Sequence, residues 1–236
     1  MLKPDFWRRY FRVYDVLNSA PPYRKLLAEI VRRVDPKFGD YILDAGVGTG
    51  NLAILLAAKG ARVVGLDFSP EAIEIYRGKE PHAETILADL TAGLPMFSNG
   101  AFDVVVSNNT LYNIPHERRL FVVQELRRII RPGGRIVLAN IHKGFRPVSV
   151  YRAAIRDSIR ESRFLHAIWM TAYLLIPAIR ILYYNWHIQA AYKFQRGNLF
   201  DLEEQKHLLE QAGFRRVSPT RVVYAGQGIL NAGWKE

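Results

Sequence analysis

The sequence predicts an α/β fold in which helices cover both faces of a doubly wound, mostly parallel β-sheet. Short apolar runs rich in valine, isoleucine and leucine alternate with helical stretches between residues 41 and 139. Continuously apolar strands are typical of a parallel sheet that is buried on both faces. A glycine-rich turn follows the first apolar run, and this is where such a sheet places a ligand-binding loop.

The elements can be assigned in order along the chain. An amphipathic helix is expected over 5–17 and a second one up to about Val34, because the residues at 18–22 between them break helices. Five strands follow, at 41–44, 62–67, 85–88, 102–106 and 135–139. The helices between them cover 52–58, a stretch from Ser69 onward and 117–130. Near the end, Asp201 is expected to cap a helix over 202–212, and a hairpin of two strands follows near 217–224 and 228–234.

The pattern divides the chain into three parts. Residues 1–34 form an N-terminal helical cap, residues 35–140 and 198–236 form the core, and residues 141–197 form a helical insert that is expected to be a lid. The 236 residues include 49% hydrophobic and 23% charged residues, which is typical of a globular protein. There is no cysteine, so disulfide scaffolds, thiolate metal sites and cysteine nucleophiles are excluded, and no metal site is predicted. The first residues lack the apolar core of a signal peptide, so a cytoplasmic protein is expected.

The turn after the first strand carries Gly46, Gly48 and Gly50, preceded by Asp44. Glycines let the backbone approach a ligand closely, and the next helix offers free N–H groups at its start. A nicotinamide-type loop would need a third glycine at position 51, where this chain has Asn51, and the Gly-Lys-Ser/Thr of a phosphate-binding loop is absent. A different nucleotide-like ligand is therefore indicated.

Acidic residues stand at the carboxyl ends of three consecutive strands. Asp67 is placed to accept hydrogen bonds from ribose hydroxyls, Asp89 from an adenine amino group, and Asp44 from a cationic group such as an α-ammonium. The carboxyl ends of parallel strands meet at one edge of the sheet, so these carboxylates are expected to line one crevice.

Together these motifs resemble the ordered signature of class I S-adenosylmethionine-dependent methyltransferases. The resemblance rests on residues 42–53, Asp67, Ala88-Asp89, 102–107 and 131–134. It implies a seven-stranded sheet whose last strand is antiparallel, S-adenosylmethionine as cofactor and S-adenosylhomocysteine as product. It implies that the three glycines contact the methionine moiety, Asp67 the ribose, Phe68 and Asp89 the adenine, and Asn108 the sulfonium. Tyr14, Asp44, Ala88, Leu90 and Asn109 complete the implied cofactor site.

A finer resemblance involves the two ends of the chain. Residues 14–18 and 228–235 are similar to the menaquinone and ubiquinone biosynthesis C-methyltransferases, which implies a prenylated quinone precursor as acceptor. Residues 107–113 and the insert depart from that family's pattern.

Three residues are candidates for catalysis because they follow the fourth and fifth strands. They are Tyr112, His116 and His142, and a phenol or carbon acid acceptor would need a base of matched pKa. Each also has a structural interpretation: Tyr112 as packing, His116 as a solvated helix residue and His142 as a loop anchor.

Positive charge is concentrated outside the predicted core. The net charge of +11 includes +5 in residues 1–33 and +7 in residues 141–197, and the same segments hold 16 of the 28 aromatic residues. Within the insert, Arg152, Arg156 and Arg160 are spaced four residues apart, with Arg163 close by, and 164–179 is an uncharged run of sixteen residues. A span of a bilayer needs about 20 residues, so we expect a lid that lies peripherally on the inner face of an anionic membrane.

Alternatives remain for the insert and the substrate. The lid could instead be an ordinary cover or a homodimer interface, with a soluble metabolite as substrate. The preferred acceptor is an apolar or amphipathic, lipid-like small molecule, either a prenylated quinone precursor or a phospholipid head group. A nucleic-acid substrate is disfavoured because 108–110 lacks the Asn/Asp-Pro-Pro-aromatic motif of methyltransferases that modify base amino groups. A cofactor-binding module without catalysis is the remaining class.

Overall fold

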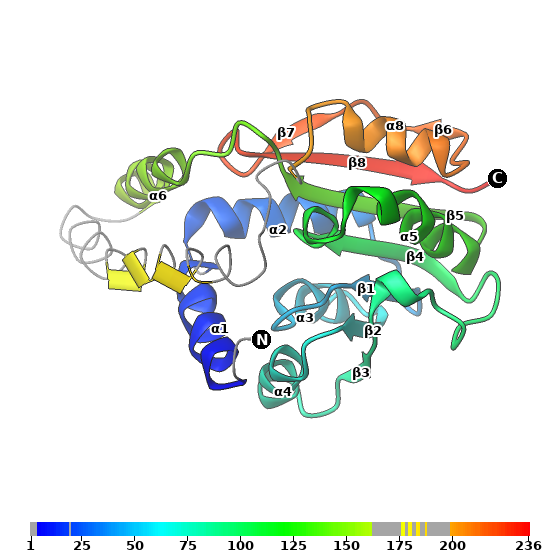
Figure 1. The fold of residues 1–236 in the computed structure, drawn as a ribbon, viewed down its shortest axis with the longest axis horizontal. Coiled ribbons are helices and arrows are strands. Elements are labelled where there is room, and N and C mark those ends of the chain that lie inside the picture. Colours follow the sequence, from blue (N-terminus) through cyan, green and yellow to red (C-terminus); the bar gives the residue numbers. More distant parts are fainter. Residues whose placement is uncertain are drawn as a thin grey trace.

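In the computed structural model, a single β-sheet organises the chain (Figure 1). The structure describes residues 4–18, 20–161, 176–177, 179–180, 183–184, 187 and 199–236. Within this part of the chain the sheet has eight strands in the order β3-β2-β1-β4-β5-β8-β6, and β7 also pairs with β8. The strands are β1 (Tyr41–Ala45), β2 (Arg62–Asp67), β3 (Glu84–Leu87), β4 (Phe102–Asn108), β5 (Ile130–Ile141), β6 (Arg216–Val217), β7 (Arg221–Val223) and β8 (Gly228–Trp234).

The first five strands are parallel and β8 runs antiparallel to β5, as expected from the sequence. The strand expected near 217–224 is divided into β6 and β7, which both pair antiparallel with β8. The pairing slips by one residue between Arg216 opposite Trp234 and Arg221 opposite Leu230. Pro219 lies in the gap and has no N–H to donate to a ladder, so it interrupts what would otherwise be the seventh strand of the sheet.

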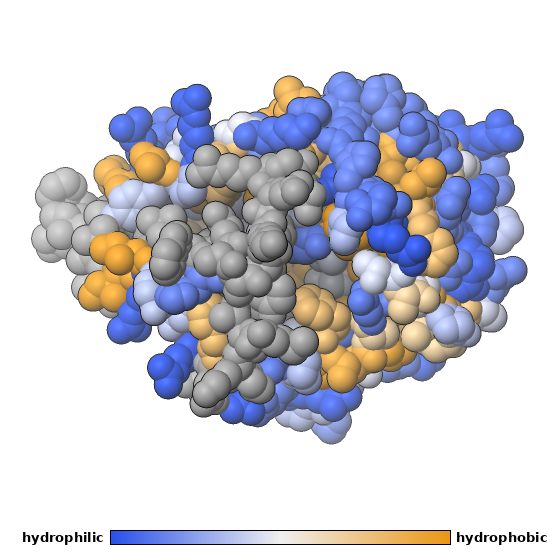
Figure 2. Space-filling model, viewed as in Figure 1, coloured by the Kyte–Doolittle hydropathy of each residue, from blue (hydrophilic) through white to orange (hydrophobic). Residues whose placement is uncertain are grey.

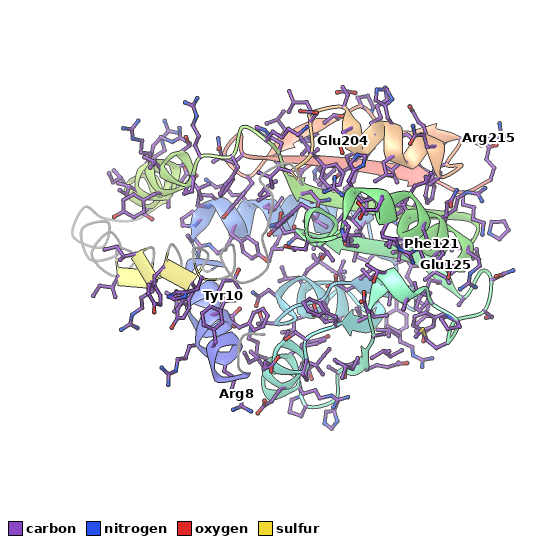
Figure 3. All side chains as sticks on the ribbon, viewed as in Figure 1. Arg8, Tyr10, Phe121, Glu125, Glu204 and Arg215 are labelled. Atoms are coloured by element: carbon purple, nitrogen blue, oxygen red, sulfur yellow. The ribbon has the colours of Figure 1, made fainter. Side chains whose placement is uncertain are left out.

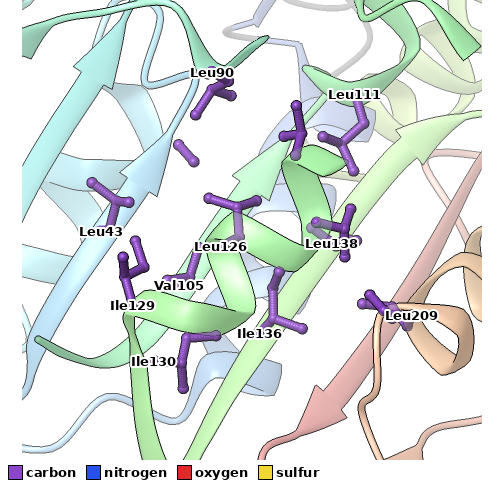
Figure 4. Close-up of a cluster of buried hydrophobic side chains, with 14 of the residues drawn as sticks. Leu43, Leu90, Val105, Leu111, Leu126, Ile129, Ile130, Ile136, Leu138 and Leu209 are labelled. Atoms are coloured by element: carbon purple, nitrogen blue, oxygen red, sulfur yellow. The ribbon is translucent and has the colours of Figure 1, made fainter. Parts of the chain in front are cut away.

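Helices cover both faces of the sheet. On one face, α2 (Pro21–Val34), α3 (Asn51–Ala57) and α4 (Pro70–Lys79) form one apolar cluster with the strands. On the other, α5 (His116–Ile129) and α8 (Glu204–Gln211) form the second, where Leu126 and Ile129 of α5 lie over the central strands (Figure 4). Successive strand residues point to opposite faces, so Ile42 belongs to the first cluster and Leu43 to the second. The predicted doubly wound sheet is confirmed.

The remaining helices gather at one end of the molecule. Figure 1 shows α1 (Pro4–Asn18), α6 (Pro147–Glu161) and the short pieces between 176 and 187 beyond the carboxyl ends of the parallel strands. Two short 3-10 helices, η1 (Leu90–Ala92) and η2 (Leu111–Asn113), follow β3 and β4 at the same edge. Helix α1 of the cap and the beginning of the insert therefore lie over the edge where the ligand-binding residues were predicted.

The insert leaves the core and rejoins it at one place. After β5, His142 forms a parallel bridge with Phe200, and the N–H of Lys143 donates to the carbonyl oxygen of Phe200 at 2.9 Å. The arginine-bearing helix is confirmed as α6, whereas Arg163 and most of the uncharged run at 164–179 lie outside the described residues. No helix in the described ranges is both long enough and apolar enough to traverse a bilayer.

One capping prediction is wrong. Helix α8 begins at Glu204 with Glu203 as its N-cap, and Asp201 does not cap it. The Asp201 carboxylate instead pairs with Lys143 Nζ at 2.6 Å, and its backbone N–H donates to Glu204 Oε2 at 2.9 Å. The Asp201 carboxylate therefore binds Lys143 of the insert rather than the start of α8.

Candidate active site

The glycine loop joins β1 to α3 through three residues in the left-handed region. Their φ angles are 84° at Gly46, 54° at Gly48 and 82° at Gly50, a region that L side chains rarely adopt. A Cβ on Gly46 would lie 2.1 Å from Thr110 Oγ1, and one on Gly50 would lie 1.9 Å from the Tyr76 ring. At Gly48, a Cβ would meet no atom within 4 Å. Side chains therefore pack against the loop at Gly46 and Gly50, whereas the space at Gly48 is open.

Asp67, at the end of β2, holds this loop in place. Its Oδ2 accepts the N–H of Gly48 at 2.8 Å, and its Oδ1 accepts the N–H of Ser69 at 3.0 Å. Burial raises the pKa of this carboxyl, although the backbone donors oppose the shift. Each carboxylate oxygen keeps a second acceptor position, so the predicted ribose contact remains compatible with this role in ordering the loop.

Two buried acceptors face the site without a partner among the described residues. They are Oδ2 of Asp44 and Oδ1 of Asn108, on the neighbouring strands β1 and β4. Asp44 is 1% exposed, and burial together with the nearby Asp67 raises its pKa to about 7. Buried polar atoms are normally hydrogen-bonded, so these two atoms fit a ligand that brings its own N–H donors.

The predicted adenine residues lie at the neighbouring strand ends. Phe68, directly after β2, is 69% exposed. Asp89 is exposed after β3, and its Oδ1 accepts the N–H and the hydroxyl of Thr91, each at 2.8 Å. Ala88 is half-buried and Leu90 is buried. The exposed phenyl ring offers a flat apolar surface beside a carboxylate.

Asn109 and Tyr14 complete the set that was predicted. Asn109 has a left-handed φ of 56°, and its N–H donates to the carbonyl oxygen of Ala139 at 2.7 Å, so it turns the chain after β4. Tyr14 belongs to α1, and its side chain lies outside the described residues.

A clasp that sequence reasoning did not assign binds α1 to the glycine loop. The Asp15 carboxylate accepts the Thr49 hydroxyl at 2.5 Å and the Asn51 amide at 3.1 Å, and pairs with Lys79 Nζ at 2.7 Å. Lys79 also donates to the Thr49 carbonyl at 3.0 Å. The only signal in the sequence was the position of Asp15 beside Tyr14 in the N-terminal motif.

The catalytic candidates occupy different environments. His116 is 74% exposed, and its Nε2 lies 3.5 Å from Glu204 Oε1 on α8. In His142, Nδ1 accepts the N–H of Gly144 at 3.0 Å and Nε2 lies 2.9 Å from the Gly226 carbonyl, so both ring nitrogens are engaged in loop contacts. Tyr112 is half-buried on η2, and burial raises the pKa of its phenol. Of the three, Tyr112 is the residue that the structure brings towards Asp44 and Asn108, through the neighbours described next.

Four tyrosines, which we call the tyrosine cluster, meet at this edge: Tyr10, Tyr23, Tyr112 and Tyr224. The Tyr23 hydroxyl accepts the Asn108 amide at 3.4 Å, and its ring lies edge-to-face with Tyr224 at 6.3 Å. Burial, together with a smaller contribution from the nearby Tyr112 phenol, raises the pKa of Tyr224 to about 12, and the same two causes raise the pKa of Tyr10. Figure 3 shows Tyr10 on α1, far from Arg215 at the other end of the molecule. These phenols stay protonated near neutral pH, so they donate hydrogen bonds rather than act as bases.

Tyr224 is held in a strained turn. Tyr224 and Ala225 have φ angles of 53° and 55°, and a left-handed conformation costs a non-glycine residue roughly 1–2 kcal/mol. Such strain persists only where the surroundings enforce it, and it gathers at functional sites. The turn between β7 and β8 holds Tyr224 beside Tyr23 and Tyr112.

Comparison with known proteins identifies a catalytic domain. Residues 42–134, which contain the glycine loop, Asp67, Asp89 and Asn108, match the family described as a methyltransferase domain. Residues 42–134 therefore form a methyltransferase domain, whose cofactor is S-adenosylmethionine. The methyltransferase is 28% identical to a demethylmenaquinone methyltransferase of Staphylococcus haemolyticus, over 94% of this chain and 89% of that protein. It is 40% identical to one of Clavibacter sepedonicus, over 45% of this chain and 43% of that protein's length.

A solved structure confirms the fold of the methyltransferase. The TehB-like methyltransferase of Corynebacterium glutamicum has a TM-score of 0.66 and 16% sequence identity, covering 99% of this chain and 100% of that one. The residues of the present site fit the cofactor, because the unpartnered oxygens of Asp44 and Asn108 suit a donor-bearing cation and the Phe68 ring is exposed. When bound, S-adenosylmethionine supplies an electrophilic methyl group. The task of the chain itself is to align the two reactants.

Proposed function

We propose that the methyltransferase acts on an aromatic, lipid-like acceptor, and that a prenylated quinol precursor is the first candidate. The observation that carries the proposal is the tyrosine cluster, whose member Tyr23 contacts Asn108 beside Asp44. Aromatic side chains prefer edge-to-face or offset contacts with other rings. A flat hydroxylated ring is therefore the acceptor that these side chains fit best.

The protonated phenols suit such an acceptor chemically. Methylation at a ring carbon forms a carbon–carbon bond and breaks the carbon–sulfur bond, and the ring proton then passes through water to the acceptor's own phenolate oxygen, which restores the aromatic ring. The acceptor's ring is most nucleophilic as its phenolate, and the neutral phenols of Tyr112 and Tyr224 can donate hydrogen bonds to that oxygen. Donors aimed at developing negative charge are effective in a water-excluded site.

The comparisons support the same choice of substrate class. The Staphylococcus haemolyticus relative, which aligns over most of both chains, is named for demethylmenaquinone. Residues 14–18, which resemble the quinone-methylating family, contain Asp15, and this residue binds the glycine loop. The family-like motif and the cofactor loop are therefore one connected unit in this chain.

The test is a comparison of acceptors. The purified chain would be incubated with isotopically labelled S-adenosylmethionine and one of three acceptors: a reduced demethylnaphthoquinol with a short prenyl tail, phosphatidylethanolamine in micelles, or catechol. Product mass and S-adenosylhomocysteine release would be measured. We expect the quinol to react at least tenfold faster than the others, with the label on a ring carbon. Label on the phospholipid amine or only on catechol would contradict the proposal.

A variant series ties the activity to the cluster. Tyr23→Phe and Tyr224→Phe should lower kcat for the quinol, and Tyr224→Phe should leave cofactor affinity unchanged. Tyr41→Phe is the matched control, because Tyr41 is a half-buried tyrosine at the amino end of β1, stacked on Phe102. Equal losses in the control would assign the effect to packing.

A further inference from the structure

One exposed face of α6 combines basic and apolar side chains. Arg152, Arg156 and Arg160 recur every four residues and are exposed, and Ile159 on the same face is 50% exposed. A shallow hollow of about 330 Å³ is lined by these three arginines with Ile155 and Ile159. The helix buries the opposite side, including Ala153, Ala154 and Asp157. We call the outward side the α6 face.

The charges of the α6 face are only partly neutralised. Asp157 pairs with Arg156 at 3.2 Å and with Lys25 at 2.8 Å. Within the described residues, no carboxylate pairs with Arg152 or Arg160. The face therefore carries an excess of positive charge, in keeping with the net +7 of residues 141–197.

Further apolar side chains are exposed at the same end of the molecule. Ile176, Ile179 and Tyr183 are exposed, and the neighbouring Tyr184 ring lies 5.2 Å from Phe6 of α1. Figure 2 shows hydrophobic and strongly hydrophilic side chains side by side at the end that α6 and the 176–187 pieces form. Apolar groups mixed with arginines are typical of surfaces that lie in the headgroup region of a bilayer.

This end is also the end of the active site. Tyr10 of the tyrosine cluster contacts Tyr184 at 6.3 Å, and α1 is bound to the glycine loop through Asp15 and Thr49. The proposed docking end and the tyrosine cluster are thus joined through the contact of Tyr10 with Tyr184.

We propose that the α6 face, with Ile176, Ile179 and Tyr183, docks onto an anionic lipid bilayer, so that the acceptor reaches the site from the membrane. The source of the acceptor rests on the proposed function, whereas the docking itself does not. Arginines would bind lipid phosphates and the isoleucines would enter the headgroup boundary, as on interfacial helices.

The experiment is vesicle co-sedimentation with the full chain. Vesicles of equal parts phosphatidylglycerol and phosphatidylcholine would be compared with pure phosphatidylcholine at 50, 150 and 500 mM NaCl. We expect binding to the anionic vesicles that weakens with salt. The double variant R152Q/R160Q should bind roughly 30-fold more weakly, from the attraction of each basic residue to anionic lipid. Ile159→Gln should weaken binding at every salt concentration.

The control variants remove the same charge or the same apolar surface elsewhere. K59Q/R215Q removes two exposed positive charges that precede β2 and β6, at the amino edge of the sheet. Leu55→Gln removes an exposed apolar side chain of α3. Both should bind vesicles like the unmodified chain. Equal weakening by K59Q/R215Q would overturn the assignment of the face, and absence of binding to anionic vesicles would overturn the docking proposal.

Two further readouts separate rival explanations. Retardation of a short RNA without vesicle binding, or a dimer mass in light scattering that R152Q/R160Q converts to a monomer mass, would replace the membrane by another partner. Methylation of a short-tailed, water-soluble quinol without vesicles should be unchanged in R152Q/R160Q. If the unmodified chain methylates no quinol yet binds vesicles, the proposed function fails and the docking stands.

Discussion

The carboxylate of Asp15, in helix α1, accepts a hydrogen bond of 2.5 Å from the hydroxyl of Thr49, in the glycine loop. Lys79 pairs with the same carboxylate at 2.7 Å, so one side chain joins the N-terminal helix, the loop and α4. The position of α1 and the conformation of the glycine loop are therefore coupled.

The variant Asp15→Asn should weaken both the attachment of α1 and the ordering of the glycine loop. Loss of a partly buried charged partner costs about 1.5–3 kcal/mol, so we expect the Kd for S-adenosylmethionine to rise at least tenfold and α1 to be cut faster in limited proteolysis. Calorimetry and mass spectrometry of the digest would measure these effects. Glu74→Gln is the control, because it removes an exposed α4 partner of Arg8, and exposed ion pairs contribute little.

Cofactor binding should depend on pH through Asp44. Its pKa is raised to about 7 by burial and by Asp67, so the carboxyl is increasingly neutral below that pH. An ammonium group binds the ionised form, hence affinity should fall by up to tenfold per pH unit below about 7, and binding near pH 6 should release a proton. Calorimetry in two buffers of different ionisation enthalpy measures that proton. A pH-independent Kd in the unmodified chain would refute this role.

Asp44 should also make the stability of the ligand-free protein depend on pH. This stability should fall as pH rises, whereas cofactor affinity should rise. A carboxyl whose pKa is raised on folding is destabilising once ionised. The free energy of unfolding should therefore decline as pH rises from about 4 through about 7, and Asp44→Asn should remove this part of the decline. Urea unfolding at several pH values, with and without the substitution, provides the measurement.

Gly50→Ala should disrupt the loop. The new methyl group would stand 1.9 Å from the Tyr76 ring, at a φ of 82°, so we expect a loss of roughly 1–3 kcal/mol in stability and loss of cofactor binding. Gly78→Ala is the matched control, because Gly78 lies in α4 with no atom near its added Cβ. It should stabilise the protein slightly, since alanine favours helix by up to about 1 kcal/mol. Thermal unfolding would distinguish the two.

Phe68→Ala should weaken cofactor binding without weakening the fold. A ring that is 69% exposed contributes little to the core, while an aromatic contact with adenine is worth roughly 0.5–1.5 kcal/mol beyond area burial. The Kd for S-adenosylhomocysteine should rise about fivefold with an unchanged Tm. Phe38→Ala, at another exposed phenylalanine, should leave both unchanged. An unaltered Kd in Phe68→Ala would place adenine elsewhere.

The sequence was sufficient for the features that depend on local pattern. Strand runs of apolar residues, the three glycines and the positions of Asp44 and Asp67 at strand ends follow from periodicity and spacing, and the structure places these glycines and both carboxylates around one loop. Asp201 was misassigned because its competing partner, Lys143, lies 58 residues away in sequence.

The features that were missed depend on tertiary contacts. The Asp15 clasp joins residues 34 and more positions apart, and the tyrosine cluster draws on both helices of the cap, η2 and a turn near the end of the chain. The division of β6 and β7 was also missed, although Pro219 was visible in the sequence, because a proline at an edge strand is tolerated. The roles assigned to His116 and His142 in catalysis remain predictions, and their observed contacts favour the structural interpretations given beside them.

The bridge between His142 and Phe200 brings the two ends of the segment between them together beside the sheet. Because these two ends are fixed to each other, insertions or deletions within the segment would leave the parallel strands in place. Evolution could therefore change the length and sequence of this segment while the strands that carry the cofactor-binding residues stay the same.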